Sequence, residues 1–347
     1  MIDRDFISEQ LSKPDSFKRK DEGPDEKFYK KPRMVQHLDI GSLALVKRIY
    51  DELIVEDDPV ILDQMASFDS HLPNRLKNKE ITGLGMNEKE MKENSFLSDY
   101  VIHDLNEDPK HPFEDERFDA VINTVSVDYM TRPFDVFSDT ARILKPGGVY
   151  IVVFSNRMFP QKVVNIWEEA HEEERIAIVD EYFAESEMFN EPNLYFSIGR
   201  RRPEEDKYSL VQFLSDPVFV MYSEKKGGKE PSRRPDLAKT MVVSQKRESV
   251  EKKKKEVKHT HRCPYCDSEL IKWQVPQNPF FATWDSEYLY ICFNDSCPYF
   301  MRGWDYTFAN GNGMGSYRFM FDESNDACHP MPVYNDKTLK DGIITQG

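Results

Sequence analysis

The first two-thirds of the chain alternates short apolar runs with stretches of helical periodicity. Asp39 precedes the first of these stretches and suits the N-cap of a helix. Apolar residues then recur every three or four positions, as one face of a helix requires: Leu43, Val46, Ile49, Tyr50 and Leu53. The run Val60–Leu62 that follows Pro59 is short, apolar and flanked by acids, which predicts a buried parallel strand.

The same alternation continues to residue 154. Further strands are predicted over residues 80–86, 100–102, 119–125 and 149–154. Helices are predicted from Asn87 and from Pro133, and Lys145–Gly148 carries residues that end a helix. Strands that alternate with helices favour an α/β fold with a doubly wound, Rossmann-like sheet of parallel strands.

The segments on either side of this core have other patterns. Residues 1–36 are polar and charged, which predicts a mobile tail. After the fifth strand, a long helix broken in two is predicted over residues 161–188. Two short strands are predicted over residues 208–214 and 218–222, and their short separation favours an antiparallel hairpin.

The length of 347 residues suggests two domains. Residues 224–258 are polar and rich in lysine, as is typical of a linker. The chain is therefore predicted to hold one domain over residues 37–223 and a second domain over residues 259–347.

Charge and cysteine content narrow the classes of function. A net charge of −15 disfavours nucleic acid and anionic membrane as general partners. The N-terminal residues do not have the apolar segment of a signal peptide, and the chain has no run of about 18 apolar residues. We therefore expect a cytoplasmic protein with no membrane partner. In a reducing compartment, clustered cysteines favour a metal over disulfides.

Four motifs carry the chemistry of the first domain. They are Ile61–Asp63, Asp104, Pro112–Val121 and Arg142–Gly148. In this order and spacing they resemble the class I S-adenosylmethionine-dependent methyltransferases, in particular those of type 11, over residues 37–222. The resemblance implies a Rossmann-like methyltransferase sheet, S-adenosylmethionine as the cofactor and methyl transfer as the reaction. Ligands of such sheets bind at the carboxyl ends of the strands.

The resemblance also implies which residues meet the cofactor. Asn87 is the polar residue nearest to the usual ribose-binding acid, and Asp104 stands where an acid reads the adenine amino group. The implied cofactor-binding residues are Asp63, Met65, Ser67, Asn87, Asp104, Leu105 and Val125. The first loop, Gln64–Asp69, contains no glycine, although the family's loop is rich in glycine because the backbone must approach the cofactor closely.

The sequence does not single out a catalytic base. His37 and His71 could exchange a proton with an acceptor, or each could have a structural role. Methyl transfer needs mainly positioning, so the lack of an obvious base does not exclude catalysis. A narrower set of methyltransferase-like proteins is similar to this chain at Gln36–Asp39, Asp63–Ser67, Ser70–Pro73, Gly83–Asn87 and Ser155–Arg157.

Four cysteines near the C-terminus have the spacing of a metal site. Cys263 and Cys266 have two residues between them, and Cys292 and Cys297 have four. Four thiolates form a closed tetrahedral zinc site, with iron as the alternative metal. The spacing resembles the Ogr/Delta-type zinc finger over residues 260–307. It implies a small zinc-ribbon-like β domain, which the metal holds folded because so short a segment buries little core.

Two hypotheses about function stay open. The first is a methyltransferase that acts on an unknown small-molecule or protein acceptor and carries a structural zinc module. The second is a catalytically inactive methyltransferase-like scaffold whose zinc module mediates protein interaction or regulation. Cys328 lies outside the spacing of the four clustered cysteines and is expected to be a free thiol.

Overall fold

The computed structural model describes the chain in segments. These are residues 4–200, 202–203, 205–209, 212, 214–228, 232–237, 247–276, 286–295, 297–309, 315–335 and 337–344. They belong to two compact units. Unit 1 comprises residues 1–196, 202–210 and 216–237, and unit 2 comprises residues 197–201, 211–215 and 238–347.

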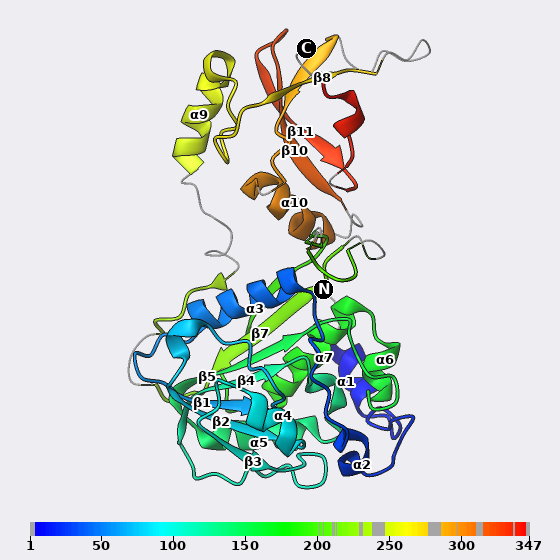
Figure 1. Ribbon diagram of the computed structural model, residues 1–347, viewed down its shortest axis with the longest axis vertical. Helices are drawn as coiled ribbons and strands as arrows, with labels where there is room; N and C mark the ends of the chain where they lie inside the picture. Colours follow the sequence, from blue (N-terminus) through cyan, green and yellow to red (C-terminus); the bar gives the residue numbers. More distant parts are fainter. Residues whose placement is uncertain are drawn as a thin grey trace. The chain divides into compact units, whose positions relative to one another are not determined.

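Unit 1 is built on a seven-stranded sheet with the order β3-β2-β1-β4-β5-β7-β6, which can be followed in Figure 1. The strands are β1 (Val60–Gln64), β2 (Glu80–Gly85), β3 (Asp99–Ile102), β4 (Phe118–Thr124), β5 (Leu144–Phe154), β6 (Asn193–Ser197) and β7 (Val218–Glu224). Strands β1 to β5 pair in parallel, and β7 runs antiparallel to β5. The predicted α/β fold with a Rossmann-like sheet is confirmed.

The helices of unit 1 follow the predicted alternation with one gap. They are α1 (Arg4–Leu11), α2 (Asp25–Tyr29), α3 (Ile40–Leu53), α4 (Glu88–Glu93), α5 (Pro133–Ile143), α6 (Asn165–Glu169) and α7 (Glu172–Glu185), with the 3-10 turns η1 (Asn74–Leu76) and η2 (Val127–Tyr129). Only η1 lies between β1 and β2. The broken helix predicted over residues 161–188 is confirmed as α6 and α7.

Helices cover both faces of the sheet. Asn123 and Thr124 are neighbours in β4, so their side chains point to opposite faces. Asn123 shares its face with Gln64, whose amide donates to Thr140 of α5 at 2.9 Å. On the other face, the Thr124 hydroxyl lies 2.6 Å from that of Tyr50 of α3. Therefore α3 covers one face and α5 the other, where α7 packs against α5.

The predicted N-cap of α3 is present. The Asp39 carboxylate accepts hydrogen bonds from the backbone amides of Gly41 and Ser42, which have no partner inside the helix. Most of the predicted apolar face of α3 is buried. The pattern predicted this helix correctly because a cap and an apolar stripe are both local features.

The N-terminal residues differ from the predicted tail. From residue 4 onward they form α1 and α2, and α1 buries Ile7 and Leu11, which are four residues apart. Asp25 is only 4% exposed and pairs with Arg19 at 2.7 Å and with Lys162 at 3.0 Å. Charges that looked solvent-exposed are paired in the fold, and pairing is what permits their burial. Their partner Lys162 is distant in sequence, so no local pattern shows it.

The predicted hairpin is also different in the structure. β7 confirms the strand at residues 218–222, but its neighbours in the sheet are β5 and β6. The described residues of 208–214 form no strand, and residues 210, 211 and 213 lie outside the described residues. In addition, β5 begins at Leu144, so Lys145–Gly148 belongs to the strand rather than to a helix end.

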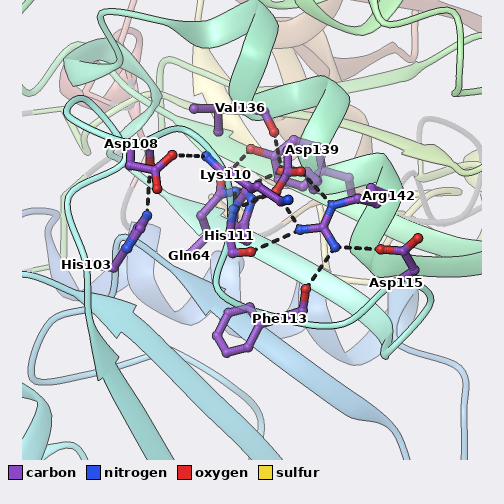
Figure 2. Close-up of polar contacts among 12 residues, drawn as sticks. Gln64, His103, Asp108, Lys110, His111, Phe113, Asp115, Val136, Asp139 and Arg142 are labelled. Atoms are coloured by element: carbon purple, nitrogen blue, oxygen red, sulfur yellow. Dashed lines mark hydrogen bonds and ion pairs between the residues drawn. The ribbon is translucent and has the colours of Figure 1, made fainter.

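A buried hydrogen-bond network fixes the connection between β3 and β4 (Figure 2). Nδ1 of His111 lies 2.8 Å from Asp139 of α5, and its Nε2 lies 2.8 Å from the side-chain amide of Gln64. Arg142 donates to Asp139 at 2.7 Å and to the backbone oxygens of His111 and Phe113 at 3.0 and 2.8 Å. Because Gln64 Nε2 donates and Asp139 accepts, His111 is neutral with its proton on Nδ1.

This network predicts a loss of stability in mild acid. Burial lowers the pKa of His111, so the unfolded chain takes up a proton at a higher pH than the folded chain does. The free energy of unfolding should therefore fall as pH drops below about 6.5, the ordinary value for histidine. Urea unfolding of wild type and His111→Asn at neutral and mildly acidic pH measures this. The variant should show a smaller pH dependence, and equal slopes would contradict the prediction.

Unit 2 contains a four-stranded antiparallel sheet with the order β11-β10-β9-β8. Its elements are α9 (Arg247–Thr260), β8 (Ile271–Gln274), β9 (Tyr288–Ile291), α10 (Pro298–Ala309), β10 (Ser316–Asp322), β11 (Ala327–Val333) and the 3-10 turn η3 (Lys340–Gly342). The small antiparallel β domain is consistent with the prediction. The lysine-rich part of the predicted linker is helical in α9, and residues 238–246 lie outside the described residues.

No helix in the described segments of either unit is long and apolar enough to cross a bilayer.

Candidate cofactor pocket and metal centre

A pocket of about 420 Å³ lies at the carboxyl ends of the parallel strands of unit 1. It is formed by the segments that follow β1 to β5, together with residues of the N-terminal segment 25–39 and with Arg202, Asp206, Lys207, Tyr208 and Asp216. All seven residues predicted to meet the cofactor line it: Asp63, Met65, Ser67, Asn87, Asp104, Leu105 and Val125. Parallel strands bring these residues together because their carboxyl ends share one edge of the sheet.

The first loop adopts a glycine-like conformation without a glycine. Met65 has φ 61°, in the left-handed region that glycine favours. The amide of Ala66 donates to Leu84 of β2 at 2.8 Å, which draws the loop onto the strand. A side chain at Gly85 of β2 would place its Cβ 2.4 Å from the Ala66 oxygen. The space for close approach is thus provided by a glycine of the neighbouring strand.

Asp63 is a buried acid with an unsatisfied oxygen. The side chain lines the pocket and is 4% exposed, and its Oδ2 has no hydrogen-bond partner among the described residues. Burial raises the pKa of Asp63 to about 7, although a hydrogen bond from Ser70 and the charge of His71 oppose the rise. A buried acceptor without a partner is costly, and a cationic ligand would satisfy it.

The polar residues after β2 hold the N-terminal segment. Asn87 caps α4 through the amides of Lys89 and Glu90, and its amide nitrogen donates to the backbone oxygen of Tyr29 at 2.6 Å. Glu90 accepts from the Arg33 amide at 2.6 Å and from the Ser67 hydroxyl at 2.7 Å. Sequence reasoning missed Tyr29, Arg33 and Glu90 as pocket residues. One signal in the sequence could have indicated the N-terminal residues among them: an aromatic pair, Phe28–Tyr29, interrupts the charged stretch.

The segments after β3 and β4 are joined by Asn106. Its amide nitrogen donates to the backbone oxygen of Tyr129 at 3.0 Å, and its own backbone amide donates to Asp104 at 2.9 Å. This second bond turns the chain so that Asp104 and Leu105 line the pocket. Val125 follows β4 with φ 45°, an uncommon conformation for a β-branched residue, and such strain gathers at ligand sites.

Both histidines considered from the sequence lie on the pocket wall. Nδ1 of His71 lies 3.2 Å from the carboxylate of Asp69. The ring of His37 meets the ring of Phe159 edge-on, with centroids 5.4 Å apart. Burial lowers the pKa of His37, so the neutral imidazole is favoured there.

The four clustered cysteines of unit 2 converge on one point. Their Sγ atoms all lie within 4.8 Å of one another, with 3.8 Å between Cys263 and Cys297 and 3.5 Å between Cys266 and Cys292. A tetrahedral ion with bonds of about 2.3 Å spaces its sulfur ligands about 3.8 Å apart, so the geometry fits zinc. Hydrogen bonds with the thiols of Cys292 and Cys297, together with burial, raise the pKa of Cys263 far above its usual range. A bound cation would allow all four sulfurs to ionise together.

The sequence of residues 68–152 matches the family model described as a methyltransferase domain. Over these residues the chain is similar to a methyltransferase domain. The matched stretch spans the strands from β2 nearly to the end of β5. It includes the pocket residues that follow β2, β3 and β4, but not Asp63, Met65 or Ser67.

Several solved structures are similar to part of the chain. One is an S-adenosylmethionine-dependent methyltransferase from Thermotoga maritima, with 16% identity and a TM-score of 0.38, covering 54% of this chain and 90% of that chain. Another, from Archaeoglobus fulgidus, has 15% identity and a TM-score of 0.37 and covers 53% and 94%. The [4+2]-cyclase SpnF has 13% identity and a TM-score of 0.38 and covers 57% and 90%. No curated protein matches the chain.

Proposed function

We propose that the methyltransferase domain binds S-adenosylmethionine in the pocket and transfers its methyl group to an acceptor. The unsatisfied Asp63 carboxylate in the pocket carries this proposal, since it needs a cationic partner and the cofactor has two positive groups. When bound, the cofactor would supply a methyl group on a sulfonium that is already reactive. The acceptor is a small molecule or a protein, as predicted from the sequence.

The residues of the pocket divide the tasks of binding. Asp63 would hold the ammonium group, while Met65 and Ser67 would line the methionine part through the tightly turned first loop. Asn87 would lie beside the ribose, and Asp104 would accept a hydrogen bond from the adenine amino group, with Leu105 against the ring. Such contacts position the reactants and exclude water, which is the main contribution of a protein to methyl transfer.

For unit 2 we propose that Cys263, Cys266, Cys292 and Cys297 hold one structural zinc ion. The four sulfurs fill a tetrahedral shell and leave no open position for a substrate, as in structural rather than catalytic sites. Three of them are buried in a core with Phe300, Trp304 and other apolar residues, so the metal would join the sheet to α10. A surface for a protein partner on this unit remains a hypothesis from the sequence.

Binding of S-adenosylhomocysteine should strengthen as pH rises. Because the pKa of Asp63 is about 7, about half of the free protein carries a proton on this carboxyl group at pH 7. That proton must leave before Asp63 can pair with the ammonium group. The affinity should rise about tenfold between about pH 6 and about pH 8, because the bound carboxylate stays ionised. Calorimetry at both pH values measures this, and proton release during binding should be visible at the lower pH.

The isosteric variant Asp63→Asn is the matched control. It cannot ionise, so its affinity should be weak at both pH values and nearly independent of pH. The comparison of the two proteins separates the effect of Asp63 from that of every other ionisable group in the pocket. If wild-type protein binds no S-adenosylhomocysteine at any pH, the inactive-scaffold hypothesis is favoured instead.

A further inference from the structure

Asp69 and His71 form an ordered pair on the wall of the pocket. Nδ1 of His71 lies 3.2 Å from Oδ2 of Asp69, and the His71 backbone amide donates to Oδ1 at 2.9 Å. Gln36 donates to Oδ2 at 3.0 Å from the N-terminal segment. Burial alone raises the pKa of Asp69, but the hydrogen bonds from His71 outweigh it and hold that pKa well below its usual value. The Asp69 carboxylate accepts from Nδ1 of His71, so the tautomer of the neutral ring that fits this contact carries its proton on Nδ1.

This tautomer leaves a lone pair on Nε2 of His71. Among the described residues Nε2 has no hydrogen-bond partner, and it is not one of the fully buried polar atoms. His71 also has φ 54°, an uncommon backbone conformation for a side chain of this size. Such strain persists where surrounding contacts enforce it, and here the two bonds to Asp69 do so.

An aromatic wall stands in the same pocket. The rings of Tyr129 and Phe159 stack with centroids 5.8 Å apart, and both residues line the pocket. His37 lies edge-on to Phe159 and interacts electrostatically with His71, which links the wall to the histidine pair. Aromatic rings of a ligand pack well against such a surface, in stacked or edge-on geometry.

We propose that His71, oriented by Asp69, takes the proton from the hydroxyl group of an aromatic acceptor whose ring packs against Tyr129 and Phe159. This rests on the proposed function of the pocket. The acceptor oxygen forms a bond to the methyl carbon as the carbon–sulfur bond breaks, and the electron pair of that bond returns to sulfur. The hydroxyl proton passes to Nε2 of His71, and Asp69 stabilises the resulting imidazolium.

Other ionisable groups of the pocket are less suited to this task. Glu90 already accepts hydrogen bonds through both oxygens, from Arg33 and from Ser67. Asp63 has an unsatisfied oxygen, but the cofactor ammonium group would occupy it. Asp104 is turned by its bond to Asn106 towards the adenine position. Of the two histidines considered from the sequence, His71 is the one whose ring is oriented by a carboxylate, and its Nε2 is open to accept a proton.

The test uses 4-nitrophenol, whose phenolate absorbs at a longer wavelength than the phenol. The probe is added to the full-length protein in the presence and absence of S-adenosylhomocysteine, at a pH below the pKa of the probe in water. Binding is followed by saturation-transfer NMR and ionisation by absorbance. The natural acceptor is not needed for this readout, and calorimetry with S-adenosylhomocysteine is run on every variant to show that the fold and the cofactor site persist.

His71→Asn removes the base and keeps the backbone, because asparagine tolerates the left-handed conformation. Asp69→Asn keeps the side-chain shape and removes the charge that fixes the tautomer. In His71→Asn we expect the ionised fraction of bound 4-nitrophenol to fall at least about tenfold, as for loss of a general base. In Asp69→Asn we expect a smaller decrease. Both variants should still bind S-adenosylhomocysteine, with only a modest change of affinity because His71 affects the pKa of Asp63.

Three results separate the two proposals. In the first, wild-type protein binds S-adenosylhomocysteine but forms no phenolate, or His71→Asn forms as much phenolate as wild type. Either outcome overturns the role of His71 and leaves the cofactor site in place. If S-adenosylhomocysteine does not bind but phenolate formation still depends on His71, the cofactor proposal is overturned and the base stands. If neither occurs, both proposals are overturned.

Discussion

Replacing Cys263 with serine is expected to abolish zinc binding and to unfold unit 2. Wild-type protein should contain about one zinc per chain, and the variant should contain none, because serine does not supply a thiolate. Structural zinc contributes about 10–16 kcal/mol of apparent binding free energy at neutral pH in small domains, more than such a unit gains from its core. Cys263 is fully buried in that core, so loss of the metal also exposes the packed residues around it.

Cys328 provides the matched control for this experiment. It is the fifth cysteine of the chain and does not belong to the converging set of four. Cys328→Ser should therefore retain zinc and a wild-type melting curve. Metal analysis, melting with and without a chelator, and resistance of unit 2 to protease would be measured on both variants. A Cys263→Ser protein that lacks metal but resists protease like wild type would contradict the prediction.

Gly85→Ala is expected to destabilise unit 1 by about 3 kcal/mol and to weaken binding of S-adenosylhomocysteine at least tenfold. The added Cβ would lie 2.4 Å from the backbone oxygen of Ala66, a contact that real structures do not tolerate. Because the obstacle is backbone, the first loop must move away from β2. That movement breaks the hydrogen bond from Ala66 to Leu84 and displaces Met65 and Ser67 in the pocket.

Gly83→Ala, two residues earlier on the same strand, is the control. Its Cβ would meet Leu97 Cδ1 at 2.5 Å, which is the flexible end of a half-buried side chain that can rotate away. This variant should lose less than about 1 kcal/mol of stability and keep its affinity for S-adenosylhomocysteine. Urea unfolding and calorimetry compare the two variants. Equal effects would show that the approach of the first loop to Gly85 is not what shapes the pocket.

Local sequence patterns predicted the order of the elements and the pocket residues that follow the strands. Apolar strands, the Asp39 cap and the residues that follow each strand are visible in short windows of sequence. In a parallel sheet the residues after each strand meet at one edge, so the predicted cofactor residues could be placed together before their contacts were known. The convergence of the four cysteines was predictable for a similar reason, because a single ion needs all four sulfurs.

The missing glycines of the first loop illustrate what the sequence could not show. The loop has no glycine, yet its backbone takes a glycine-like conformation at Met65 and lies against Gly85 of another strand. Gly85 of β2 thus takes over the role of the missing loop glycines. It lies about 20 residues further along the chain, so a motif search confined to the first loop does not include it. For the same reason the buried Asp25 and the pocket residues of the N-terminal segment were missed.

The sequence by itself determined the alternation of strands and helices, the capped helix α3 and the set of four cysteines that come together, since each depends on spacing along the chain. Only the tertiary structure decided that the charged N-terminus is ordered, that Asp63 is buried with an unsatisfied oxygen, and that Asp69 orients His71 on the pocket wall. The physical reason is that burial and charge pairing depend on which distant segments are neighbours, and this information is created only when the chain folds.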